Sequence, residues 1–176
     1  PIESLELPPT DRLGLQNDAY ALTRAGFAPA TVFLSLTEAY KNETDATVWG
    51  DLSANLHSME TLVSEEPYLD RLHIYGRELY RPIVQRVGWN ARPGEGHLDA
   101  LLRSTVLGQI GSYGDSQVIA EAQARFASYV KNSGSVHPDI RGVVFGLAAQ
   151  EGDSSAYETF WDLERKASIQ EEKLRL

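Results

Sequence analysis

Residues 46–63 read ATVWGDLSANLHSMETLV, and this stretch carries the clearest helical pattern in the chain. Its apolar side chains recur every three or four positions, the spacing that places them on one face of an α-helix. Asp45 precedes the pattern, where a carboxylate can accept hydrogen bonds from the free amides of a first helical turn. The stretch therefore predicts an amphipathic helix that packs against other helices.

Two helices are expected before this segment. The sequence Pro8-Pro9-Thr10 predicts a helix start, with Thr10 as the capping residue. Gly26 offers the left-handed backbone conformation that commonly ends a helix, and Pro29 suits the first turn of the next one. Together the two segments predict an antiparallel helical hairpin.

The chain after this central helix repeats the same rhythm. Apolar residues spaced for one helix face run from Leu69 to Val87 and include Gly76. Pro82 should kink this helix, because proline lacks a backbone N–H. The glycine-rich stretch 88–96 is the longest break in the pattern, and we expect two subdomains to meet there.

The remaining segments also predict helices only. Their expected caps or first residues are Asp115, His137-Pro138, Asp153 and Ser168. No window alternates apolar and polar residues as a half-buried strand does, and pairs of helix starts recur near the ~35 to 45 residue unit of helical solenoids. We therefore predict an all-α fold of about eight to nine helices, stacked as antiparallel hairpins in a HEAT- or armadillo-like α-solenoid. Residues 1–176 are expected to form one helical domain.

The composition argues against several classes of partner. Of the 176 residues, 42% are hydrophobic, enough for one domain with a sizeable core. The 25 acidic and 16 basic residues give a net charge of -9, which repels nucleic acid and anionic lipid headgroups. No apolar run approaches the ~20 residues that span a bilayer, and the absence of cysteine is compatible with a reducing cytosol. We expect neither a nucleic-acid partner nor a membrane partner.

The sequence contains no catalytic or metal-binding motif. The helix of a zinc peptidase presents two histidines four residues apart with a glutamate beside the first, and this spacing does not occur here. The histidines are scattered, and each is interpreted as a surface or capping residue: His57, His73, His97 and His137. No serine lies in the glycine-flanked turn of a hydrolase nucleophile. We expect no catalytic residue, no metal ligand and no cofactor in these residues.

One polar cluster interrupts the first predicted helix. Arg12, Gln16, Asn17 and Asp18 lie in an otherwise apolar-periodic segment, and Arg12 and Gln16 share a helix face because they are four residues apart. In a structural interpretation, Asp18 forms an ion pair with Arg103 of a later helix and fixes the register of two hairpins. In a functional interpretation, Arg12 and Gln16 line a cavity that holds peptides.

Several long strings of residues resemble one enzyme family. They are Asp11-Arg12-Leu13-Gly14-Leu15-Gln16-Asn17-Asp18, the stretch 47–56, the stretch 89–103 with its Pro-Gly-Glu-Gly-His-Leu-Asp sequence, and the closing 170–173. Over nearly its whole length, the chain is similar to the C-terminal helical domain of the M1 zinc aminopeptidases, closest to the cytosolic puromycin-sensitive type. The stretches 112–118 and 133–139 match that family only in helical pattern.

The resemblance implies a role as well as a fold. In that family a helical array caps the catalytic site of the same polypeptide and encloses a cavity for peptide substrates, and this segment would be about its first half. The zinc ion and its ligands would belong to a catalytic domain outside these residues, and a start at Pro1 rather than methionine agrees with this expectation. The implied activity of the intact enzyme is removal of N-terminal residues from peptides in the cytoplasm.

Two other classes of function are alternatives. A free-standing α-solenoid adaptor that binds a peptide or protein along its concave face would show the same helical periodicity. An independent hydrolase would need an arrangement of acid and base residues that the sequence does not contain. A His-Glu-x-x-His helix encoded upstream in the same reading frame would favour the peptidase over the adaptor.

Overall fold

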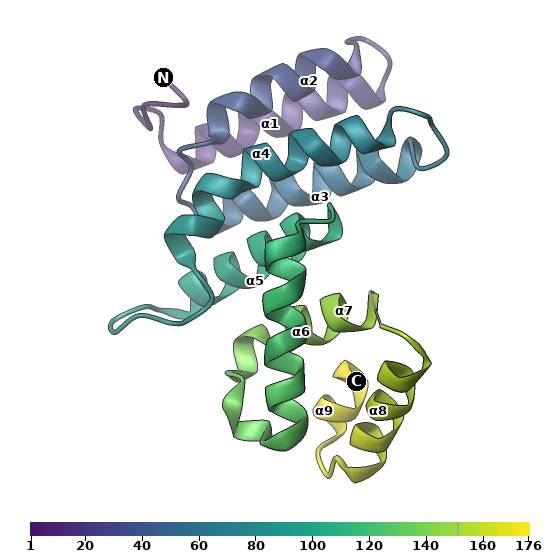
Figure 1. Ribbon diagram of the computed structural model, residues 1–176. Helices are drawn as coiled ribbons and strands as arrows, with labels where there is room; N and C mark the ends of the chain where they lie inside the picture. Colours follow the sequence, from purple (N-terminus) through teal and green to yellow (C-terminus); the bar gives the residue numbers. More distant parts are fainter. Residues whose placement is uncertain (151) are drawn as a thin grey trace. The chain divides into compact units, whose positions relative to one another are not determined.

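The computed structural model describes residues 1–150 and 152–176, and every regular element within them is helical (Figure 1). This confirms the predicted all-α class. The α-helices are α1 (Pro9–Arg24), α2 (Ala30–Thr37), α3 (Ala46–Leu62), α4 (Leu69–Val87), α5 (His97–Ser112), α6 (Ser116–Lys131), α7 (Pro138–Gln150), α8 (Ser154–Lys166) and α9 (Gln170–Arg175). Short 3-10 helices, η1 (Glu38–Tyr40) and η2 (Ser133–Ser135), follow α2 and α6.

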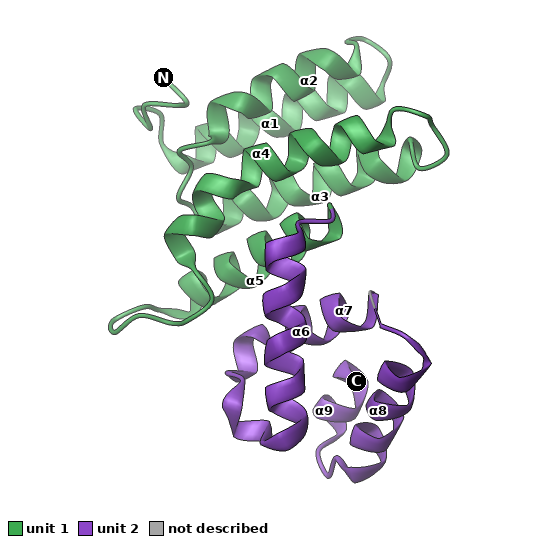
Figure 2. Cartoon of the chain, viewed as in Figure 1, with its two compact units in different colours: residues 1–113 green, residues 114–176 purple. Residues whose placement is uncertain are grey.

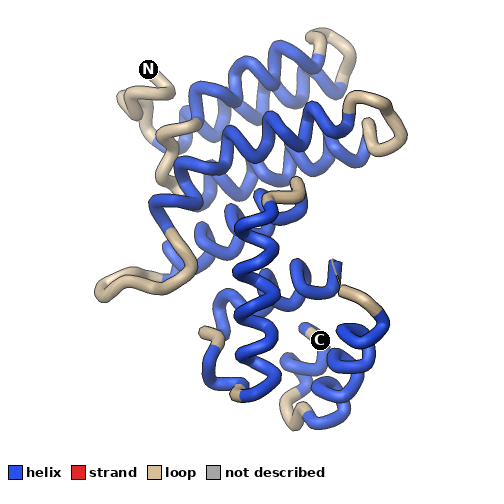
Figure 3. The backbone as a smooth tube through the Cα atoms, viewed as in Figure 1, coloured by secondary structure: helices blue, strands red, loops and turns tan. Residues whose placement is uncertain are grey.

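The chain divides into two compact units, Pro1–Tyr113 and Gly114–Leu176 (Figure 2). The sequence predicts a boundary between subdomains in the stretch 88–96, and this prediction is wrong: the boundary falls after Tyr113. Figure 3 shows that stretch as a long loop between α4 and α5. Both of these helices belong to the first unit because α5 packs against α3 and α4. A break in helical periodicity marks a loop, but helix packing decides where a compact unit ends.

Helix α3 lies at the centre of the first unit. It packs against α1 and α5, and its apolar side chains Trp49, Leu52 and Leu56 are at most 1% exposed. The Trp49 ring lies 4.8 Å, centroid to centroid, from the Tyr80 ring of α4. Burial of each such side chain contributes about 1.5–3 kcal/mol. The amphipathic helix predicted from residues 46–63 is therefore confirmed, and its apolar face forms the core.

The second unit has an aromatic core of its own. The ring of Phe126 from α6 stacks on that of Phe160 from α8 at 4.4 Å, and Phe145 of α7 meets Phe126 edge-on at 5.9 Å. The short helix α9 is attached to this core through Glu172, which accepts hydrogen bonds from Tyr129 and Arg141. Contacts between rings from three helices thus hold the second unit together.

Three aspartates cap helices as the sequence predicts. The Asp45 carboxylate accepts hydrogen bonds from the backbone amides of Thr47 and Val48, at 2.8 and 3.1 Å. Asp115 caps α6 and Asp153 caps α8 in the same way. These contacts satisfy amides that a first helical turn leaves without an intrahelical partner.

Two other predicted caps are wrong. Helix α1 begins at Pro9 with Pro8 as its N-cap, so Thr10 falls inside the first turn. Proline is well suited to these positions, because its fixed φ is already helical and its missing N–H would have no intrahelical partner there. Helix α9 begins after Ile169 with no side-chain cap, so Ser168 lies outside it.

Candidate functional site

The polar cluster of the first helix contains a buried ion pair. The Arg12 guanidinium donates two hydrogen bonds to the carboxylate of Glu43, Nε to Oε2 at 2.6 Å and Nη2 to Oε1 at 2.8 Å. Arg12 is 4% exposed and Glu43 is fully buried. The backbone amides of Thr44 and Asp45 also donate to Oε1 of Glu43, at 2.7 and 2.8 Å. The pair therefore fixes the start of α1 against the connection between η1 and α3.

Aromatic residues extend this network. The Tyr40 hydroxyl donates a 2.6 Å hydrogen bond to the backbone oxygen of Arg12, and Nε1 of Trp49 donates to the backbone oxygen of Glu43 at 3.1 Å. Burial, followed by the nearby Glu43 carboxylate, raises the pKa of Tyr40 to about 12. Tyr40 is therefore a neutral hydrogen-bond donor across the physiological pH range.

A second set of polar contacts, which we call the seam, joins α1 to α3. Nδ2 of Asn55 donates to Oε1 of Gln16 at 2.9 Å and to Oδ1 of Asn17 at 2.8 Å, and Nδ2 of Asn17 donates to Asp51 at 3.0 Å. Gln16 is fully buried, and its Nε2 has no hydrogen-bond partner among the described residues. Polar pairs of this kind fix the register of two packed helices, because a shift along the helix axis would break them.

The predicted partner of Arg103 differs from the one that the structure shows. Asp18 is exposed on α1, whereas Nη2 of Arg103 donates to the Glu95 carboxylate at 2.5 Å. Nε of Arg103 also donates to the backbone oxygen of Gly88 at 3.1 Å, and Nη2 to that of Val87 at 3.3 Å. Arg103 therefore fastens the loop between α4 and α5, and Asp18 is not its partner. The spacing of acids and bases along the sequence did not reveal this local pairing.

Substitutions at these two positions should have different effects. Arg103→Ala should lower the free energy of unfolding by about 1–3 kcal/mol, because buried carbonyl oxygens would lose a charged donor. Asp18→Asn should change it by less than about 0.5 kcal/mol, as is usual for an exposed residue. Urea unfolding followed by circular dichroism measures both. Equal destabilisation by the two substitutions would contradict this assignment.

The fold brings two of the four histidines, His57 and His73, to the same carboxylate. Nε2 of His73 lies 2.7 Å from Oε1 of Glu60, and Nδ1 of His57 lies 3.3 Å from Oε2 of the same carboxylate. His97 is the first residue of α5, and His137 directly precedes α7. Among the described residues, no group of three histidine, cysteine, aspartate or glutamate side chains is arranged to hold a metal ion.

Two pockets lie apart from the polar cluster. One, of about 470 Å³, is lined mainly by apolar residues of α2, α3 and α4, and the other, of about 420 Å³, lies beside α8. Neither is lined by Arg12 or Gln16. Within the described part of the chain, no helix combines the length and apolar character needed to cross a bilayer.

Sequence reasoning identified Arg12 and Gln16 as unusual but missed Glu43 and Tyr40. A guanidinium inside an apolar helical pattern requires a buried acceptor, and this requirement was the available signal. Nothing local singled out Glu43, since it lies in a short polar connection before Asp45 and 31 residues from Arg12. Its burial depends on packing between segments distant in sequence.

The described residues form an all-helical fold whose packed helices are joined by buried polar contacts. The family model described as the ERAP1-like C-terminal domain matches residues 2–176, and the chain belongs to this family. Among curated relatives, Aminopeptidase M1-A of Oryza sativa subsp. japonica is 33% identical, over 99% of this chain and 21% of its own length. Aminopeptidase M1 of Arabidopsis thaliana is 29% identical over 99% of this chain and 21% of its own length.

A third relative tests the specific resemblance inferred from the sequence. Puromycin-sensitive aminopeptidase of Caenorhabditis elegans is 24% identical over 97% of this chain and 18% of its own length. The resemblance to the C-terminal domain of M1 aminopeptidases is confirmed. The chain spans about a fifth of the length of these relatives.

Proposed function

We propose that this chain forms about the first half of the C-terminal helical array of a cytoplasmic zinc aminopeptidase that removes N-terminal residues from peptides. The match of the family model to residues 2–176 is the observation that carries the proposal. Relatives named aminopeptidases, which extend well beyond the matched part, support it. In this proposal the catalytic domain of the same polypeptide is the partner of the array, and the zinc ion and its ligands lie in that domain.

The array would act as a wall and a cap for the catalytic site. A wall that admits short peptides and excludes folded proteins has to keep its shape, and the buried contacts of the first unit serve this purpose. The Arg12–Glu43 pair fixes the start of α1, and the seam between Gln16 and Asn55 fixes its register on α3. In this proposal, Arg12 and Gln16 shape the peptide cavity by positioning α1 rather than by touching the peptide.

The proposal is tested by comparing this chain with the complete polypeptide encoded by the same transcript. We expect the purified chain neither to retain zinc after dialysis nor to cleave aminoacyl-arylamide substrates. The complete polypeptide should retain zinc and cleave these substrates, and a chelator should abolish the cleavage. Zinc content is measured by elemental analysis and cleavage by release of the arylamine.

Either of two results would contradict the proposal. The first is stoichiometric zinc, or chelator-sensitive turnover, in the isolated chain. The second is a complete polypeptide that lacks aminopeptidase activity, as expected of a free-standing adaptor.

A further inference from the structure

A pocket of about 420 Å³ lies beside α8 in the second unit. Its walls come from the end of α7, one face along most of α8 and the end of the chain. Its lining includes Asp153, Tyr157, Phe160, Trp161, Glu164 and Leu176. The volume is within the range of sites that hold small organic ligands.

Two aromatic side chains of this pocket are unusually open to solvent. Tyr157 is 61% exposed and Trp161 is 47% exposed. Their rings lie 6.2 Å apart and meet edge to face, with an interplanar angle of 78°. By contrast, Phe160 on the same helix is 9% exposed and stacks in the core of the unit. Phe160 therefore forms part of both the core and the pocket wall, whereas Tyr157 and Trp161 expose their rings to solvent at the pocket.

The charged groups of the pocket are acidic. Asp153 and Glu164 line it, and none of its described lining residues is basic. One oxygen of Asp153, Oδ1, caps α8 by accepting from the amide of Ala156 at 3.0 Å. Glu164 has a distant basic partner, Lys173, with Nζ 4.0 Å from Oε1. Both carboxylates thus retain capacity to accept further hydrogen bonds.

We propose that this pocket binds the arginine side chain of a peptide. A guanidinium is attracted to the face of an indole or phenol ring within about 6 Å, and more strongly where water is partly excluded. Its planar set of N–H donors also matches the carboxylate of Glu164, which lies one helical turn from Trp161. Asp153, about 16 Å away along α8, adds negative charge at the other end of the pocket. A neutral apolar ligand would fit less well, because it would remove water from these carboxylates without replacing their hydrogen bonds.

The site is independent of the proposed function, since all of its lining residues lie in this chain. Its test therefore uses the 176-residue chain itself. N-acetylarginine amide is the probe, and N-acetylcitrulline amide is the matched ligand, with nearly the same shape and no charge. Isothermal titration gives the affinity, and NMR follows the Trp161 indole N–H. We expect saturable binding of the arginine compound, with the citrulline compound at least tenfold weaker.

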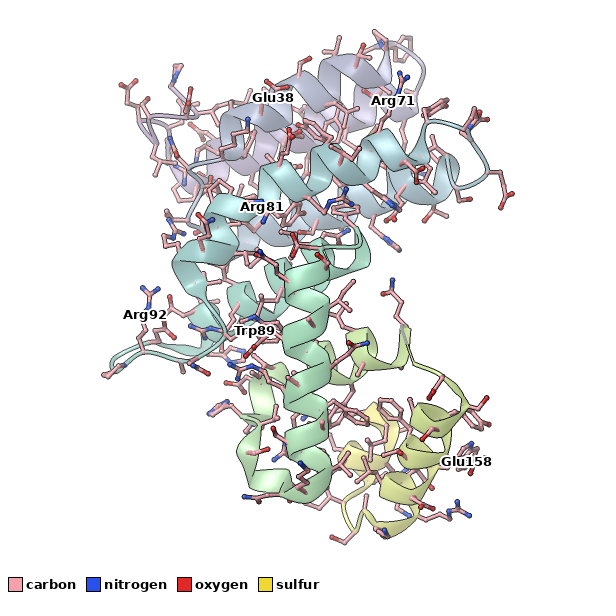
Figure 4. The ribbon with its side chains drawn as sticks, in the orientation of Figure 1. Glu38, Arg71, Arg81, Trp89, Arg92 and Glu158 are labelled. Atoms are coloured by element: carbon pink, nitrogen blue, oxygen red, sulfur yellow. The ribbon has the colours of Figure 1, made fainter. Side chains whose placement is uncertain are left out.

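Substitutions in the protein separate the pocket from the general negative charge of the chain. Glu164→Gln should weaken binding severalfold. Asp153→Asn, which keeps a side chain that caps helices well, should have a smaller effect because its carboxylate is about 16 Å away along α8. Glu158→Gln is the control, because it removes the same charge from α8 at an exposed position that does not line the pocket (Figure 4). Trp161→Phe should bind more tightly than Trp161→Ala, since it keeps an aromatic face. Circular dichroism verifies that every variant keeps its helices.

The proposal is overturned by any of three results. One is equal affinity for the arginine and citrulline compounds, or no binding of either. Another is an effect of Glu158→Gln as large as that of Glu164→Gln, which would mean that overall charge alone attracts the probe. The third concerns Leu176, which lines the pocket and carries the terminal carboxylate of this chain. Appending Gly-Ser-Gly moves that carboxylate, and binding that disappears would assign the affinity to the chain terminus.

Discussion

Replacing Glu43 with alanine should lower the free energy of unfolding of the first unit by about 3–5 kcal/mol, since removing one partner of a buried ion pair leaves the other charge uncompensated. Arg12, which is 4% exposed, would have no carboxylate to accept its two hydrogen bonds. The amides of Thr44 and Asp45 would also lose their acceptor. Urea unfolding can be followed by tryptophan fluorescence in a Trp161→Phe background, where Trp49 and Trp89 report on the first unit.

The double variant Arg12→Met/Glu43→Leu separates the effect of losing one partner of the ion pair from the cost of burying both charges. Replacing both members of a buried ion pair with apolar residues is often neutral or stabilising, because neither charge then has to be desolvated. We therefore expect the double variant to be more stable than Glu43→Ala. The ion-pair explanation fails if Glu43→Ala unfolds at the same urea concentration as the parent.

The contribution of Glu43 should also depend on pH. Burial alone would raise the pKa of the Glu43 carboxyl, but hydrogen bonds from Arg12, Asp45 and Thr44 together lower it below the ordinary value of 4.5. A lowered pKa in the folded state stabilises the fold above the unfolded value, and this stabilisation is lost as the pH falls through the folded value. The difference in stability between the parent and Glu43→Gln should therefore be largest near neutral pH and shrink below about pH 4.5. A pH-independent difference would contradict this account.

Local features of the fold could be predicted because they depend on residues close in sequence. Asp45 caps α3 through amides two and three residues away. Gly26 follows the end of α1 with φ +78°, a backbone conformation in the left-handed region. The apolar stripe of residues 46–63 predicted the buried face of α3 from helical geometry alone.

Pairings between distant segments could not be predicted in the same way. Arg12 and Glu43 are 31 residues apart, and neither periodicity nor composition specifies which polar groups of different helices meet. For Arg103, the sequence favoured a distant partner, Asp18, whereas the structure shows Glu95 from the preceding loop. The loop 88–96 looked like a boundary because its glycines break the helical pattern, but Arg103 and the packing of α5 attach it to the first unit.

The apolar pattern of α4 did not reveal the structural role of Gly76. The sequence pattern places Gly76 on the buried face of the helix, and in the structure this position packs directly against the ring of Tyr113. A Cβ atom at position 76 would lie 2.5 Å from Cδ2 and 3.0 Å from Cζ of Tyr113. Tyr113 is 1% exposed and packs edge-on against Tyr80 at 6.0 Å, so its ring has no free space to move into.

Gly76→Ala should therefore destabilise the first unit by about 2 kcal/mol, although alanine favours a helix by about 1 kcal/mol over glycine. Gly50→Ala in α3 is the matched control, because a Cβ at position 50 meets no heavy atom within 4 Å among the described residues. This control should raise stability by up to about 1 kcal/mol. Adding Tyr113→Leu to Gly76→Ala should recover part of the loss, since a smaller side chain opens space for the new methyl group. Urea unfolding of the parent, Gly76→Ala, Tyr113→Leu and the double variant measures the coupling, and a stabilising Gly76→Ala would show that the Tyr113 ring shifts without cost.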